Sequence, residues 1–136
     1  MATEERIDLV GEESIVVARR RAREYVRGLG FGLLDQSRIA TAVSELTRNV
    51  IRYAIDSRGE VVIRELPESG TRIGVEIVVS DAGPGIDDVS QAMRDGYTSG
   101  RGLGLGLPGT RRLVDEMEID SGRGRGTTVT IRKWRP

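Results

Sequence analysis

The segment that most restricts the fold of this chain is SGRGLGLGLPG at residues 99–109, which has five glycines between positions 100 and 109. Each glycine in a helix costs about 1 kcal/mol relative to alanine, and a strand with this pattern would have one bare face. We therefore predict a loop that runs into a helix from about Leu107 to Met117, with its backbone amides able to turn toward a phosphate. Taken alone, the tract is equally typical of a flexible surface loop.

Composition excludes several kinds of chemistry. The chain has no cysteine and no histidine, so thiolate or imidazole metal sites, Ser-His-Asp catalysis and a phosphohistidine on this chain are excluded. Its only lysine, Lys133, lies outside any P-loop or kinase strand motif. Acidic and basic residues balance at 21 each, which disfavours nucleic acid and membrane partners. No signal peptide or membrane-spanning run is present, so a cytoplasmic location is expected.

Hydrophobic periodicity predicts one domain over residues 1–136, built from alternating helices and strands. The chain order favours an α+β fold, a two-layer α/β sandwich with a mixed, mostly antiparallel sheet and helices on one face. Asp35 is the expected N-cap of the second helix, and Pro67–Gly70 the expected turn between two strands. The predicted helices span 12–28, 35–55, 87–95 and 107–117, and the predicted strands span 6–10, 60–66, 71–80 and two segments within 118–134.

The helix at 35–55 carries Glu45 and Asn49 four residues apart, at the edge of its apolar stripe. A carboxylate and an amide at the boundary of the core are placed to face a cleft. On its own, such a pair is also an ordinary polar contact along a helix.

The motif Asp81-Ala-Gly-Pro-Gly85 follows directly after an apolar strand. A carboxylate at a strand end can accept a hydrogen bond from the exocyclic amine of adenine, where guanine has a carbonyl. Gly83 and Gly85 remove side chains where a flat base must approach the backbone. A simple turn would use the same residues.

The order of these motifs resembles the GHKL (Bergerat-fold) ATP-binding family. The matching segments are Glu45-Leu-Thr-Arg-Asn49, Asp81-Ala-Gly-Pro-Gly85, Gly102-Leu-Gly-Leu-Gly106-Leu and Gly126-Thr-Thr128, and the resemblance covers about residues 7–134. Since a phosphoacceptor histidine is absent, the chain is similar to the small serine/threonine switch kinases of bacterial partner-switching systems, of the RsbT type. Asn49-Val-Ile-Arg-Tyr53 departs from the Asn-x-x-x-His pattern usual in anti-sigma kinases of the RsbW and SpoIIAB type.

The resemblance implies ATP and Mg²⁺ as cofactors and a role for each motif. Glu45 would be the catalytic base that accepts the proton of a serine hydroxyl, and Asn49 would ligate Mg²⁺. Asp81 would bind adenine with support from Thr127, beside Gly83 and Gly85. A lid over the phosphates would contain Arg101, Gly102, Leu103, Gly104, Leu105 and Gly106. Arg101 either offsets γ-phosphate charge or is solvated, and Arg48 either pairs with Glu45 or contacts phosphate.

The resemblance also implies partners. The substrate would be a STAS-domain antagonist protein with an acceptor serine, and the second partner a PP2C-type phosphatase or its regulatory region. Two alternatives stay open: an anti-sigma factor kinase that sequesters a sigma subunit, and a nucleotide-gated scaffold that transfers no phosphate. The arginine-rich helix at 12–28 is either a docking face or a solvated surface.

Overall fold

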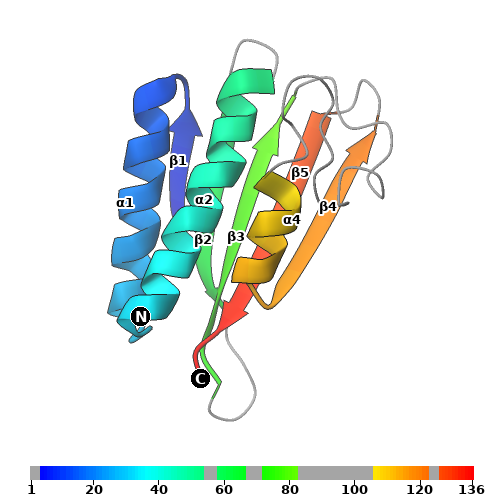
Figure 1. The fold of residues 1–136 in the computed structure, drawn as a ribbon. Helices are drawn as coiled ribbons and strands as arrows, with labels where there is room; N and C mark the ends of the chain where they lie inside the picture. Colours follow the sequence, from blue (N-terminus) through cyan, green and yellow to red (C-terminus); the bar gives the residue numbers. More distant parts are fainter. Residues whose placement is uncertain (1–3, 54–57, 67–71, 83–105, 123–125) are drawn as a thin grey trace.

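Five strands form one sheet in the computed structural model, which describes residues 4–53, 58–66, 72–82, 106–122 and 126–136 (Figure 1). The sheet order is β1-β2-β3-β5-β4, so the last strand of the chain lies inside the sheet. In chain order the elements are β1 (Glu5–Leu9), α1 (Glu12–Gly28), α2 (Leu33–Tyr53), β2 (Gly59–Leu66), β3 (Gly74–Asp81), α4 (Gly106–Leu113), β4 (Glu116–Gly122) and β5 (Gly126–Trp134).

The expected α+β fold is confirmed, but the sheet is not mixed. Every pairing between the described strands is antiparallel. The reason lies in the strand order: β3 and β4 run in the same direction, and β5 lies between them with the opposite direction. The two parallel-running strands therefore never become neighbours.

The helices of the described residues, α1, α2 and α4, cover one face of the sheet, as predicted (Figure 1). The apolar stripes read from the sequence are buried there: Ile15, Ala18, Ala22 and Val26 on α1, and Ile39, Ala42, Val43, Leu46 and Val50 on α2. Alternate residues of strands β2, β3 and β5 form the sheet side of the core; they are Val61, Ile63, Val75, Ile77, Val79, Val129 and Ile131. Burial of these side chains away from water is the main stabilising contribution to the fold.

The opposite face of the sheet carries a row of charges across neighbouring strands. Glu76 of β3 is only 4% exposed and accepts hydrogen bonds from Arg64 at 2.6 Å and from Arg132 at 2.8 Å. Arg132 also bonds Glu118 at 2.9 Å and Glu116 at 3.2 Å. Burial alone would raise the pKa of Glu76, but the hydrogen bonds from Arg132 and Arg64 outweigh it and hold that pKa below its ordinary value.

Two local predictions are wrong. Asp35 is not an N-cap, because α2 already begins at Leu33 and Gln36 N donates to Gly32 O at 2.9 Å. The helix predicted to reach Met117 ends at Leu113, and Met117 belongs to β4, where cross-strand pairing with Ile131 outweighs helical periodicity. The predicted turn at 67–70 and the helix at 87–95 lie outside the described residues.

Candidate nucleotide site

A polar row continues the apolar, helix-facing side of the sheet at the end of β3. Asp81 and Thr127 are direct partners in the β3–β5 pairing, and Thr127 is also the partner of Ser121 in the β4–β5 pairing. Residues directly opposite each other in an antiparallel pair point to the same face. The Ser121 and Thr127 hydroxyls are hydrogen-bonded at 2.9 Å, and Ser121 Oγ also donates to Gly126 O at 3.0 Å. The row therefore presents a carboxylate next to two linked hydroxyls.

Two glycines allow the backbone to close tightly around Asp81. Gly126 has a φ of 79°, which side-chain-bearing residues avoid, and a Cβ there would meet the Asp81 carbonyl oxygen. Gly59 is the partner of Asp81 in the β2–β3 pairing. A Cβ at Gly59 would meet the Ser80 carbonyl oxygen and come 2.7 Å from Val50 Cγ1 of α2. Both glycines are required by close packing at this end of the sheet.

The contact between Val50 and Gly59 places the C-terminal half of α2 over the same end of the sheet. Glu45 and Asn49 lie on that half, and both are partly buried, as expected for the edge of the apolar stripe. Arg48 Nη1 donates to Glu45 Oε1 at 2.9 Å, so of the two roles left open for Arg48, the structure has the ion pair with Glu45. Both side chains are somewhat more than a third exposed, so this pair adds little to stability.

The described part of the glycine tract begins at helix α4. Gly106 is the first residue of α4, and the buried Leu107 follows it as α4 packs against α2. In Figure 1 the end of α2 and the end of β3 lie at one end of the molecule, and α4 begins closer to mid-height and runs away from that end. The other predicted site residues lie outside the described residues; they are Gly83, Gly85, Arg101, Gly102, Leu103, Gly104 and Leu105.

The structure thus places four predicted site residues toward one end of the fold, Glu45, Asn49, Asp81 and Thr127, and Gly106 at the start of α4. Sequence reasoning missed Ser121 and Gly59. The near-symmetric segment Ser121-Gly-Arg-Gly-Arg-Gly-Thr127 contained a signal, since its two ends, Ser121 and Thr127, are direct partners in the β4–β5 pairing. Gly59 carried no comparable signal, because its constraint comes from Ser80 and Val50 across the fold.

The described residues contain no group of three or more acidic side chains that could hold a metal ion. Within the same residues, no helix is both long and apolar enough to cross a membrane.

A five-stranded antiparallel sheet covered by helices on one face, with an acidic and hydroxyl row at its end, defines a class of ATP-binding domain. The chain belongs to the histidine kinase-like ATPase domain family, whose model matches residues 11–133. This confirms the family resemblance read from the motifs at Glu45, Asp81 and Gly102.

Within that family the chain is a homologue of the serine/threonine-protein kinase RsbT of Bacillus subtilis (strain 168). The two are 42% identical over 128 residues, which cover 94% of each chain. The anti-sigma F factor of Clostridium beijerinckii is 33% identical over 127 residues, covering 89% of this chain and 86% of that protein. Among solved structures, a mycobacterial sensor histidine kinase, MprB, superposes with a TM-score of 0.58 at 21% identity, covering 98% and 99% of the two chains. That likeness supports the fold alone.

Proposed function

We propose that this chain is an ATP- and Mg²⁺-dependent protein serine kinase of a bacterial partner-switching pathway. It acts in the cytoplasm as a single domain over residues 1–136. The observation that supports this most directly is the row formed by Asp81, Thr127 and Ser121 at one end of the sheet. The half of α2 that contains Glu45 and Asn49 packs over that end. This arrangement occurs in a chain that is 42% identical to a serine/threonine-protein kinase over nearly its whole length.

The residues present fit an adenine nucleotide. Gly59 and Gly126 have no room for a side chain beside the backbone of strand β3, so the sheet end is shaped by main chain. In the proposed complex, the Asp81 carboxylate accepts a hydrogen bond from the adenine amine. The Thr127 hydroxyl, held by Ser121, supports the same base directly or through water. This donor and acceptor set selects adenine over guanine.

Asn49 is the proposed protein ligand to Mg²⁺, because its amide oxygen is a hard donor on the partly buried face of α2. The metal would supply charge neutralisation on the phosphates. Gly106 and the preceding glycine tract, Gly102-Leu103-Gly104-Leu105 with Arg101, are proposed to surround the phosphates. Gly83 and Gly85 are proposed to let the adenine base approach the backbone beside Asp81. The start of helix α4 at Gly106 adds free N–H groups that favour an anion.

Glu45 is the proposed catalytic base. Its Oε1 is held by Arg48 at 2.9 Å, so we assign Oε2 as the atom that accepts the proton of the partner's serine hydroxyl. As that proton leaves, the serine oxygen forms its bond to the γ-phosphorus and the bond to the departing ADP oxygen breaks. Phosphoryl transfer depends mainly on positioning and charge stabilisation, so the catalytic base need not be a strong one.

The proposed substrate is a STAS-domain antagonist bearing the acceptor serine, and the second partner is a PP2C-type phosphatase or its regulatory region. The test is incubation of the chain with radiolabelled ATP and the STAS proteins encoded near its gene. We expect label on one serine, loss of transfer in Glu45→Gln, and normal transfer in the matched control Glu24→Gln on the exposed side of α1. ATP that binds without transfer to any STAS serine would contradict the proposal.

A second candidate is an anti-sigma factor kinase, favoured by the 33% identity to the anti-sigma F factor of Clostridium beijerinckii. Stable co-purification with a sigma subunit, released by the STAS protein, would favour it over the switch kinase. A nucleotide-gated scaffold is the third candidate. It predicts that Glu45→Ala leaves partner exchange intact, whereas a kinase-driven switch is stopped by this variant.

A further inference from the structure

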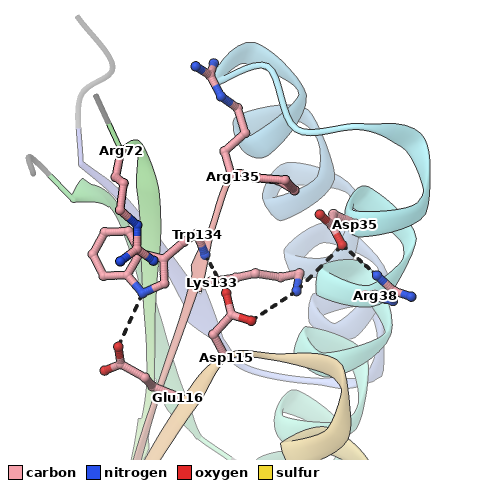
Figure 2. A pocket seen from close by; sticks show the side chains of 9 residues that line it. Asp35, Arg38, Arg72, Asp115, Glu116, Lys133, Trp134 and Arg135 are labelled. Carbon is pink, nitrogen blue, oxygen red and sulfur yellow. Dashed lines mark hydrogen bonds and ion pairs between the residues drawn. The ribbon is translucent and has the colours of Figure 1, made fainter. Parts of the chain in front are cut away.

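The end of the sheet farthest from Asp81 contains a hollow of about 660 Å³, here called the distal hollow. It is lined by the first turn of α2, the segment before β3, the α4–β4 connection and the end of β5 (Figure 2). Gly74 and Asp81 are the two ends of the β3–β5 pairing. Seven residues of strand separate them, about 23 Å, so the hollow is remote from the candidate nucleotide site.

The acidic side chains of the distal hollow are already engaged. Asp35 accepts a hydrogen bond from Arg38 at 2.9 Å and lies 3.6 Å from Lys133 Nζ. Asp115 also lies 3.6 Å from Lys133 Nζ and accepts the backbone N–H of Trp134 at 2.8 Å. Lys133 is buried between these two acids, which Figure 2 shows as a continuous chain of contacts. These acids therefore stabilise the hollow itself.

The third acid of the hollow is engaged in the same way. Glu116 accepts hydrogen bonds from Arg132 at 3.2 Å and from Trp134 Nε1 at 3.3 Å. Two arginines of the lining, in contrast, have no acidic partner among the described residues. Arg72 stacks on the Trp134 ring, and Arg135 donates one hydrogen bond to Leu29 O at 2.9 Å. The unfilled hydrogen-bonding capacity of the hollow is thus cationic.

The stacking geometry leaves Arg72 well placed to bind an anion. Its guanidinium carbon lies 4.4 Å from the centre of the Trp134 ring, and the ring itself packs on the backbone of Gly74. A guanidinium stacked on an aromatic face keeps its N–H donors in its own plane, where a carboxylate can bind two of them at once. Arg72 is exposed, so these donors face solvent.

An apolar surface adjoins the hollow on α2. Leu33 and Leu34 are 73% and 65% exposed, in the same helical turn as Asp35. Leu34 lies four residues before Arg38, so the two side chains are neighbours on one face of the helix. Tryptophan and arginine are the residue types that most often dominate binding energy at protein interfaces, and Leu34 adds exposed apolar surface next to Arg38.

We propose that the distal hollow is a docking surface for a protein partner, which inserts an acidic segment with an adjacent apolar side chain. The carboxylates of that segment pair with Arg72, Arg38 and Arg135, and its apolar side chain packs on Leu34. Charge complementarity carries this choice of occupant, because the acids of the hollow have partners within the chain, whereas Arg72 and Arg135 have no acidic partner among the described residues and Arg38 has a single one, Asp35. The proposal does not rest on the kinase activity.

Helix α2 gives this surface a direct connection to the candidate nucleotide site. It carries Asp35 and Arg38 at its first turns and Glu45 and Asn49 farther along. Ten residues of helix separate Asp35 from Glu45, about 15 Å. A partner held at the distal hollow leaves the nucleotide end open, so a second protein can approach that end at the same time.

The test is selection from a random peptide library displayed on phage against the full immobilised chain. We expect enriched peptides to be rich in Asp and Glu with an apolar residue beside them. Trp134 is the only tryptophan of the chain, so its emission reports binding of a synthesised peptide at the hollow directly. The double variant Arg38→Ala/Arg72→Ala is expected to weaken that binding about tenfold or more.

The matched control is Arg19→Ala/Arg20→Ala, which removes the same charge from exposed positions on α1. It should leave the peptide affinity within about twofold. Leu34→Ser, measured separately, should also weaken binding, and equal thermal unfolding of all variants shows that they fold. No acidic enrichment, unchanged Trp134 emission, or equal loss in the α1 control would overturn the proposal. Displacement of the peptide by inorganic phosphate or a short oligonucleotide at equal concentration would do so too, since it would reveal a general anion site.

Discussion

Replacement of Gly126 by alanine tests the tight packing around Asp81. The φ of 79° at Gly126 is a left-handed conformation, which costs an L-residue about 1–2 kcal/mol. The added methyl would also meet the Asp81 carbonyl oxygen and lie 3.0 Å from Ala82 Cα. Displacing well-packed atoms costs about 1–3 kcal/mol more. We therefore expect Gly126→Ala to lower the free energy of unfolding by about 2–5 kcal/mol.

The assay is urea unfolding followed by circular dichroism, with calorimetric titration of ADP on the folded variant. Because the methyl displaces the backbone that holds Asp81, we expect weaker ADP binding as well as lower stability. Gly28→Ala is the matched control, since a Cβ at Gly28 meets nothing within 4 Å and the residue is helical. That change should be neutral or stabilise the fold by up to about 1 kcal/mol.

The reasoning is refuted if Gly126→Ala is as stable as the parent protein. It is also refuted if both glycine variants lose the same stability, because the effect would then be unrelated to Asp81. Loss of stability with unchanged ADP affinity would separate the two parts of the argument. That result would support the argument about close packing at Gly126, but it would contradict the assignment of the base pocket to this end of β3.

Three further predictions follow from the described contacts. Asp81→Asn should weaken adenine nucleotide binding by about 1.5–3 kcal/mol, measured by calorimetry, and an unchanged affinity would remove Asp81 from the pocket. Ser121→Ala should weaken the same binding by about 0.5–1.5 kcal/mol, because it removes the hydrogen bond that holds Thr127; an ADP affinity equal to that of the parent would show that Ser121 has no such role. The lowered pKa of Glu76 means that its ion pairs stabilise the fold above its ordinary value of 4.5, and that this contribution is lost as pH falls through the lower folded value. Glu76→Gln should therefore cost about 1.5–3 kcal/mol in urea unfolding at about pH 7. This cost should shrink as the pH is lowered below 4.5, whereas a cost that does not change with pH would contradict the pKa direction.

Periodic helices could be predicted from the sequence because their signal is local. The helix at 12–28 agrees with the structure at both ends, and the apolar stripe of α2 is buried as expected. Asp35 lies inside α2, which begins at Leu33, and its carboxylate pairs with Arg38 and with Lys133, which lies nearly a hundred residues later. Local spacing contains no information about such a distant partner.

The candidate site was predictable where function imposes residue types and spacing along the chain. Glu45 and Asn49 share a helix face, and Asp81 ends a strand, so their motifs can be recognised from residue types and spacing along the sequence alone. The antiparallel pairing of Asp81 with Thr127 and the close approach at Gly59 depend on strand order. Strand order is a long-range property, and the insertion of β5 between β3 and β4 has no local signature.

That insertion has a consequence for synthesis on the ribosome. The four earlier strands leave the exit tunnel before residues 126–134, yet β4 has no neighbour until β5 arrives. During that interval the backbone of β3 is an open edge on which another nascent polypeptide can pair. A truncated chain that ends before residue 126 would lack β5, so the edge of β3 would stay unpaired and the product would be degraded by proteases.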